Sequence, residues 1–236
     1  MSHPSNTDWP PGFAVRPSPK SVPPNLIEAF SRLPSSAVAD CLGRTAGSVG
    51  LRAYHRPHSL SFAGPAVTVR VRPGDNLMIH LAIAQARPGD VIVVDGGSCL
   101  SQALVGGLMR TSALSRGVAA FVIDGAVRDL DEWEDGRLPV YALGHSPRGP
   151  SKDGPGEINV PIACAGMAVV PGDLIVGDSD GVVTVPREDV GEVLARTHRH
   201  LEVERQIRDQ NQNGEPDLER IYRILRSKGC PIEKSV

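Results

Sequence analysis

The stretch that decides the fold is residues 91–129, VIVVDGGSCLSQALVGGLMRTSALSRGVAAFVIDGAVRD. Two short apolar runs rich in Val and Ile, at 91–94 and 119–123, each end in Asp-Gly. Between them, a Leu/Ala-rich stretch has helical spacing and stops at Gly117. A strand, a helix and a second strand in this order predict two roughly parallel neighbouring strands.

Two features of this stretch point to chemistry. Gly106 and Gly107 break the helical pattern near its start, and the free N–H groups at a helix N-terminus favour an anion. Arg128 and Asp129 follow the second strand, in a loop position that commonly carries function. Arg offers a forked donor to a carboxylate, and a single Asp suits an oxygen-preferring cation such as Mg²⁺. If the strands are neighbours, these residues suit a small oxo acid with a divalent metal; an exposed Arg128–Asp129 ion pair is the alternative.

The segments on either side predict an arm, a central domain and a helical extension. Residues 1–24 contain seven prolines, which prevent a helix or a central strand. We expect an arm that is disordered or lies on a neighbour, with Trp9 and Phe13 as anchors. The central domain is expected at 25–186 and the C-terminal helical extension at 187–236. Helices are expected at 26–33 (with Asn25 as N-cap), 35–42, from 77, at 187–211 and at 218–225, and strands at 64–71, 140–143, 158–163, 167–170, 174–176 and 182–185.

A tripeptide recurs along the chain. Pro-Gly-Asp stands at 73–75, 88–90 and 171–173, and an apolar run follows each copy. Pro-Gly sets a tight turn. After 90 and 173 the run predicts a strand, whereas after 75 it has helical period. We commit to an α/β protein with a mixed sheet, whose strands can close into a barrel-like core.

The composition is that of a globular protein and argues against several classes of partner. Hydrophobic residues make up 40% and charged residues 22% of the 236, values typical of one domain with appendages. A net charge of -2 and 4% aromatic residues give no reason to expect nucleic-acid binding. We expect no membrane span, since no apolar run approaches about 18 residues. We expect a cytoplasmic location, since the start lacks a secretory signal and the four cysteines are dispersed.

The motifs of this chain resemble those of the RraA-like family, which contains regulator of ribonuclease activity A and the 4-hydroxy-4-methyl-2-oxoglutarate / 4-carboxy-4-hydroxy-2-oxoadipate aldolases. The likeness rests on a strand followed by DGG, then on ALVGGLM, GVAAFVIDGAVRD and INVPIACAGMAVVPGDLIVGDSDGVVTVP at 158–186. It covers most of residues 35–210. The resemblance implies an α/β, phosphohistidine-domain-like β/β/α fold with a mixed sheet, a barrel-like core and a C-terminal helical extension.

The resemblance also implies an activity. It implies a class II aldolase that cleaves a 4-hydroxy-2-oxo diacid to pyruvate and a second oxo acid, or decarboxylates oxaloacetate, with Mg²⁺ or Mn²⁺ stabilising a pyruvate enolate. Homotrimers or homohexamers are expected. Asp129 matches the metal ligand of the family, Arg128 the substrate-contacting Arg, and Glu204 a catalytic Glu donated by a neighbouring subunit. The segment whose backbone binds the substrate carboxylate matches Gly106, Gly107, Leu108 and Met109.

One position departs from the aldolase pattern. The aldolases carry an acidic residue directly after the first Gly of the helix-start segment, where this chain has Gly107. Aldol cleavage removes a proton from the 4-hydroxyl group and needs a positioned base, whereas decarboxylation does not. From the sequence we therefore expect decarboxylation to exceed aldol cleavage, unless His145 or another group supplies the base.

Two other functions fit the resemblance. The first is a non-catalytic regulator that binds a ribonuclease, although the extension carrying Glu204 is absent from the shorter regulator. The second is a methyltransferase, a label attached to this family. A cofactor-binding loop should read close to G-x-G after the first strand, and here Asp95 is followed by Gly-Gly-Ser-Cys, which disfavours it. His198 and His200 stand two apart on an expected helix, so they point to different faces and are expected to be solvated.

Overall fold

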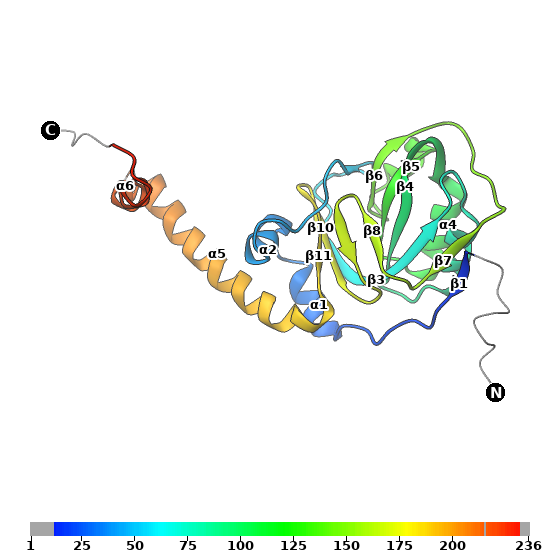
Figure 1. The fold of residues 1–236 in the computed structure, drawn as a ribbon, viewed down its shortest axis with the longest axis horizontal. Helices are drawn as coiled ribbons and strands as arrows, with labels where there is room; N and C mark the ends of the chain where they lie inside the picture. The colour runs from blue at the N-terminus through cyan, green and yellow to red at the C-terminus, as the bar shows by residue number, and fades with distance from the viewer. Residues whose placement is uncertain (1–11, 215, 232–236) are drawn as a thin grey trace.

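The computed structural model describes residues 12–214 and 216–231. Within this part of the chain, a nine-stranded mixed sheet forms the body (Figure 1). Four strands run parallel to their neighbours at its centre: β3 (Phe62–Val71), β4 (Val91–Val105), β5 (Ala120–Val127) and β6 (Val140–His145). The main path of the sheet is β1-β7-β3-β4-β5-β6-β2, with β1 (Phe13–Val15), β2 (Arg52–Ala53) and β7 (Gly156–Ile158) toward its edges.

The parallel pairing of β4 and β5 confirms the arrangement predicted from residues 91–129. The two strands pair in register from Val91 to Asp95, and the register then shifts repeatedly before Val105. Residues 98–105, the first part of the stretch with helical spacing, instead continue β4, because they pair with β5. Gly97 and Ser98 both have positive φ, which lets the strand bulge at this point. The helix begins only at Gly107.

Two helices cover one face of the sheet. α3 (Leu77–Gln85) and α4 (Gly107–Arg116) pack their apolar side chains on β3, β4 and β5. In α3 the buried residues Met78, Ile79, Ala82 and Ile83 follow helical spacing. α4 ends at Gly117, whose φ of 71° closes the helix in the left-handed conformation that favours glycine. The first and main core of the protein lies between these helices and the sheet.

Short strands cover the opposite face. β8 (Ile162–Cys164) and β9 (Met167–Val169) form a hairpin, and β10 (Leu174–Asp178) pairs with β11 (Gly181–Val185) and with β3. Their apolar residues bury the other side of the central strands in a second core. The body is thus layered as strands, sheet and helices, so the expected mixed α/β fold is confirmed.

The remaining helices form a third cluster beside β10 and β11. α1 (Pro24–Phe30), α2 (Ser35–Cys41) and α5 (Val190–Gln212) pack there, and the short 3₁₀ helix η2 (Arg187–Asp189) precedes α5. The predicted N-cap Asn25 is wrong, because α1 begins at Pro24, two residues before the expected start, and proline is well suited to a first helical turn. α5 leaves the body and carries α6 (Leu218–Ser227) away from the sheet (Figure 1).

The N-terminal arm contributes to the sheet. Phe13–Val15 forms β1, which pairs in parallel with β7 at the edge of the sheet, where a strand flanked by prolines is tolerated. The arm therefore lies on its own subunit at this point, and Phe13 packs against the first core. Trp9, the other expected anchor, lies outside the described residues. In the described part of the chain, no helix combines the length and the apolar composition that a membrane-spanning segment needs.

Candidate functional site

The candidate site lies where the parallel strands end. Gly106 follows β4, Arg128 follows β5, and His145 is the last residue of β6. The carboxyl ends of parallel strands open onto the same edge of a sheet, where α/β proteins commonly bind ligands. The neighbouring β4 and β5 therefore bring together the helix start and the Arg-Asp pair, as the sequence predicts.

Asp129 and the start of α4 are in direct contact. The Gly107 N–H donates to Asp129 Oδ2 at 2.9 Å, so the carboxylate lies against the helix N-terminus, where negative charge is favoured. Asp129 itself has a φ of 57°, which turns the chain sharply into the 3₁₀ helix η1 (Leu130–Trp133). A Cβ at Gly106 would overlap Asp129 Oδ2 and the stem of Arg128. Only glycine at 106 permits this close approach.

Arg128 completes the pair. Its Nε lies 3.7 Å from Asp129 Oδ2, and the two side chains are 37% and 42% exposed. Both are therefore accessible to a small molecule. The backbone amides of Leu108 and Met109 lie in the first turn of α4, whose N–H groups have no acceptor within the helix. Leu108 is 85% exposed, which leaves this turn open.

Glu132 is a residue of the site that the sequence reasoning missed. A Cβ at Gly107 would overlap the carboxylate of Glu132, so this carboxylate fills the space that a side chain at 107 would need. The Glu132 N–H donates to the Asp129 carbonyl at 3.0 Å, and the buried Trp133 donates from Nε1 to the Arg128 carbonyl at 3.0 Å. The sequence could have pointed to Glu132 because it stands three residues after Asp129, and residues three apart lie on one side of a 3₁₀ turn.

An ion pair between a buried arginine and a partly exposed aspartate fixes η1 against α4. Arg110 of α4 is 4% exposed and bonds Asp135, just beyond η1, and its guanidinium lies 5.8 Å from the ring centroid of Trp133. The Arg110 hydrogen bond holds the pKa of Asp135 well below its usual range. These contacts hold Glu132 beside Gly107.

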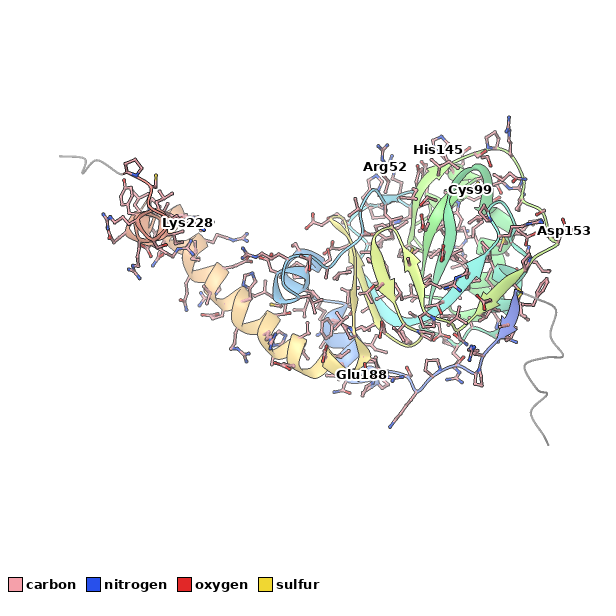
Figure 2. The ribbon with its side chains drawn as sticks, in the orientation of Figure 1. Arg52, Cys99, His145, Asp153, Glu188 and Lys228 are labelled. Carbon is pink, nitrogen blue, oxygen red and sulfur yellow. The ribbon has the colours of Figure 1, made fainter. Side chains whose placement is uncertain are left out.

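The Arg128–Asp129 pair stands between two hollows. One, of about 60 Å³, is lined by residues from four segments: Asn76, His80, Ala103, Leu104, Val105, Gly106, Leu108, Met109, Arg128, Asp129, Pro150 and Lys152. The other, of about 270 Å³, is lined by Val127, Arg128, Asp129, Leu130, His145, Ser146 and Pro147. The long loop after β6 therefore contributes to both. Figure 2 shows His145 and Asp153, the neighbour of Lys152, on the part of the body away from α6.

The donor set at this point fits a hard divalent cation. Asp129 brings an exposed carboxylate to the start of α4, and the Gly107 amide holds one of its oxygens. Carboxylate oxygens combined with several waters are the coordination that Mg²⁺ prefers, and Mn²⁺ accepts similar ligands. Arg128 and the helix N-terminus would face an anion bound next to that cation.

Glu204 lies apart from these residues within one chain. It stands on α5, where His200 Nε2 is 3.2 Å from Glu204 Oε1 and 3.2 Å from Asp40 Oδ2 of α2. His200 is thus half-buried between two carboxylates, and the expectation that it is merely solvated is wrong because α2 packs against this face of α5. Glu204, Asp40 and His200 also bring metal-type ligand atoms within 4.8 Å of one another. Glu204 is 43% exposed and open to a neighbouring molecule.

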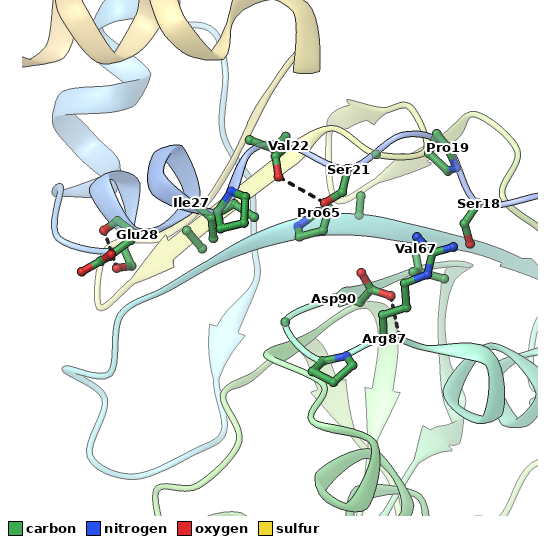
Figure 3. Close-up of a pocket in the computed structure, with 17 residues that line it drawn as sticks. Ser18, Pro19, Ser21, Val22, Ile27, Glu28, Pro65, Val67, Arg87 and Asp90 are labelled. Carbon is green, nitrogen blue, oxygen red and sulfur yellow. Dashed lines mark hydrogen bonds between the residues drawn. The ribbon is translucent and has the colours of Figure 1, made fainter.

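A separate cavity of about 420 Å³ lies at the amino ends of the strands (Figure 3). It is bounded by the arm, α1, the start of β3 and the turn before β4, and much of its wall is apolar, including Val22, Ile27 and Val67. Asp90 there accepts a 2.8 Å hydrogen bond from the Arg87 N–H within its own turn. The cavity holds none of the predicted site residues, so it is distinct from the candidate site.

Known proteins resemble the chain in sequence. A family model described as RraA-like, Aldolase/RraA, matches residues 35–184. A protein of Halalkalibacterium halodurans named "Putative 4-hydroxy-4-methyl-2-oxoglutarate aldolase" is 37% identical over 177 residues, which cover 74% of this chain and 83% of that protein.

Solved structures resemble the chain in fold. Streptomyces coelicolor RraAS2, described as an unusual member of the RNase ES inhibitor RraA protein family, has a TM-score of 0.73 at 26% identity, covering 80% of this chain and 98% of that one. The RNA-processing inhibitor RraA from Thermus thermophilis has a TM-score of 0.59 at 30% identity, covering 65% of this chain and 92% of that one. Because the family model spans more than half of the sequence, this chain belongs to the RraA-like family.

Proposed function

We propose that the protein is a divalent-metal-dependent lyase that cleaves a 4-hydroxy-2-oxo diacid to pyruvate and a second oxo acid, and that it also decarboxylates oxaloacetate. The observation that carries the proposal is the contact of Asp129 with the Gly107 amide. It joins a metal-type ligand, the forked donor of Arg128 and the N-terminus of α4 in one place. The name of the relative from H. halodurans supports the same reaction class.

The substrate's 2-oxo acid end is proposed to bind at the start of α4. The first-turn amides of Leu108 and Met109 would donate to its carboxylate, as helix N-termini do for anions. Arg128 would donate to the 2-oxo oxygen, where negative charge develops when the carbon–carbon bond breaks. Lys152, which lines the same hollow, would face the second carboxylate of the diacid.

A bound Mg²⁺ or Mn²⁺ at Asp129 would supply Lewis-acid stabilisation of that developing charge. Decarboxylation and aldol cleavage share this requirement. They differ in one proton: aldol cleavage removes the proton of the 4-hydroxyl group, and decarboxylation does not. Comparing the rates of the two reactions therefore distinguishes the role of the base from the roles of the metal and Arg128.

Glu132 is proposed as the group that accepts this proton. Its carboxylate occupies the space beside Gly107 in which the aldolases carry their acid. The sequence-based expectation that decarboxylation exceeds aldol cleavage rested on the lack of an acid at 107, and Glu132 gives a reason to revise it. With a carboxylate at this point, both reactions are expected.

The active form is proposed to be a homotrimer or homohexamer in which Glu204 of one subunit completes the site of another. Glu204 is half-exposed and belongs to a helix that leaves the body (Figure 1). Within one chain its ion pair is with His200 of the same helix, which also faces Asp40 of α2, and not with Arg128 or Asp129. A role in catalysis therefore requires a second copy.

Binding of a ribonuclease is the second candidate, because RraA structures share the fold. The RraA of T. thermophilis matches only 65% of this chain, so about a third of the present chain has no counterpart there. RraAS2 matches 80% of this chain, so the lyase is favoured by the contact of Asp129 with the Gly107 amide rather than by length.

A coupled assay tests the proposal directly. Pyruvate release from 4-hydroxy-4-methyl-2-oxoglutarate and from oxaloacetate is followed with lactate dehydrogenase, with Mg²⁺, with Mn²⁺ and after EDTA treatment. Metal-dependent turnover of both substrates is expected. Absence of turnover with every metal, together with inhibition of a ribonuclease, would favour the regulator instead.

A further inference from the structure

The Asp carboxylates of the three Pro-Gly-Asp turns are all buried, but they accept hydrogen bonds from different parts of the chain. Asp75, Asp90 and Asp173 are 0%, 9% and 6% exposed. Asp90 accepts from the Arg87 N–H and Asp173 from the Val170 N–H, each three residues back in its own turn. Burial raises the pKa of both carboxyl groups. Each of these side chains closes its own turn, and Asp173 also accepts from the Arg187 N–H at 3.1 Å.

Asp75 instead reaches a loop more than seventy residues away. Its Oδ2 accepts from Ser151 Oγ at 2.7 Å, from the Asp153 N–H at 2.7 Å and from the Gly154 N–H at 3.0 Å. Burial alone would raise the pKa of Asp75, but these bonds and one from the Leu77 N–H together hold it below its ordinary value. The ionised carboxylate is therefore the form that binds the loop.

The residues held by Asp75 flank Lys152 on both sides. Lys152 lies between Ser151 and Asp153 in sequence, and its side chain lines the hollow next to Arg128. The loop is also tied by the backbone, because Ser151 donates to the Gly74 carbonyl at 2.8 Å and accepts from the Asn76 N–H at 3.1 Å. Lys152 thus extends from a segment fixed on each side of it.

The second oxygen of Asp75 holds the opposite wall of the hollow. Oδ1 accepts from the Leu77 N–H at 2.9 Å, at the first residue of α3. One turn later, His80 lines the same hollow as Lys152. Burial, and secondarily the charge of Lys152, lowers the pKa of His80. One carboxylate therefore sets the position of Lys152 relative to α3.

We propose that Asp75 is a positioning residue that holds Lys152 over the site, so that the second carboxylate of a diacid meets a fixed cation. The inference rests on the proposed function for its substrate, but the position of Lys152 is measurable without turnover. In the part of the chain that the structure describes, neither the Asp90 nor the Asp173 carboxylate forms a hydrogen bond with this loop.

The kinetic test uses a mild and a stronger variant. Ser151→Ala removes one hydrogen bond to Asp75 and the one that Ser151 Oγ accepts from Arg72, and Asp75→Asn removes the charge. Both are expected to raise KM for the diacid several-fold with little change in kcat. In Ser151→Ala/Lys152→Met, KM should be no higher than in Lys152→Met alone, because the first change acts through Lys152. Additive effects in this pair would overturn the proposal.

A second readout is independent of activity. The ring pKa of His80, measured by NMR, should rise in Lys152→Met, and also in Ser151→Ala and Asp75→Asn as Lys152 moves away. Amide hydrogen exchange of Asp153 and Gly154 should quicken in the latter two variants. Asp173→Asn changes a matched Pro-Gly-Asp turn remote from the loop and should alter none of these values.

The lyase function and the positioning role of Asp75 can each be refuted without the other. If the wild type turns over no oxo acid, the proposed function is wrong, and the His80 pKa and the exchange rates still decide the role of Asp75. If Ser151→Ala and Asp75→Asn leave both readouts at wild-type values, Asp75 does not position Lys152, whatever the protein catalyses. The same conclusion follows if the loop amides exchange faster while KM and the His80 pKa stay unchanged.

Discussion

The carboxylate of Glu132 occupies the space that any side chain at Gly107 would need. Two positions that are 25 residues apart in sequence therefore compete for one place beside Asp129. An acid is possible at either position, but both cannot be accommodated without a shift of η1 or of the start of α4. Although position 107 lacks the acid of the aldolases, Glu132 places a carboxylate at the same point, so we predict that Glu132 is the base of aldol cleavage.

Glu132→Gln is expected to lower the rate of aldol cleavage by about 10²–10⁴-fold, the usual contribution of a general base. Decarboxylation of oxaloacetate should fall far less, because it needs no proton removal. The ratio of the two kcat values is the measurement. Glu134→Gln, a neighbouring exposed change, serves as the control.

The reverse exchange sharpens this test. Gly107→Asp alone should impair both reactions, because its side chain overlaps Glu132. Gly107→Asp/Glu132→Ala should recover part of the aldol cleavage. If Glu132→Gln leaves the ratio unchanged, Glu132 is not the base.

Asp129→Asn, or removal of metal with EDTA, is expected to abolish pyruvate release while circular dichroism stays that of the wild type. Asn keeps the size of the side chain but removes the charge that attracts a divalent cation. Added Mg²⁺ or Mn²⁺ should restore the EDTA-treated protein and not the variant. Turnover that persists without metal would contradict this role.

Arg128→Lys should lose about 2–3 kcal/mol of transition-state stabilisation, measured as kcat/KM, by analogy with a hydrogen bond to a charged group. Lys retains the charge but cannot reproduce the fork of the guanidinium. Arg148→Lys, in the loop after β6, is the matched control and should change kcat/KM little. A wild-type kcat/KM in Arg128→Lys would exclude a forked contact.

Mixing inactive Asp129→Ala subunits with inactive Glu204→Ala subunits should restore part of the activity. Some sites in the mixed oligomers would combine an intact Asp129 with an intact Glu204 from another copy. The activity of oligomers verified to contain both variants is the measurement. No recovery would refute a shared site and leave Glu204 to its contact with His200.

Asp75 makes the stability of the protein depend on pH in a known direction. Because its pKa is lowered in the folded state, its contribution is fully present above the unfolded value of about 3.9 and is lost as pH falls through the folded pKa. Asp75→Asn should therefore lower the free energy of unfolding most at pH 5–7 and least near pH 3. Urea unfolding at both pH values measures this, and an equal loss at both would contradict it.

The sequence by itself determined the central unit and much of the site. Alternating and continuous apolar runs are local patterns, so they predicted the strands β3 to β6, the helix α3 and the end of α4 at Gly117. The Arg128–Asp129 pair and the helix start at Gly106 were recognised from their positions after strands. The pairing of β4 with β5 then brought them together as expected.

Only the tertiary structure decided the remaining features. Residues 98–105 have helical spacing but extend β4, because hydrogen bonds to β5 outweigh local preference. Glu132 belongs to the site only because the Arg110–Asp135 pair holds η1 against α4, a contact that the sequence does not reveal. The role of Asp75 likewise depends on a loop more than seventy residues away, because a carboxylate selects its donors by proximity in space, which sequence spacing does not encode.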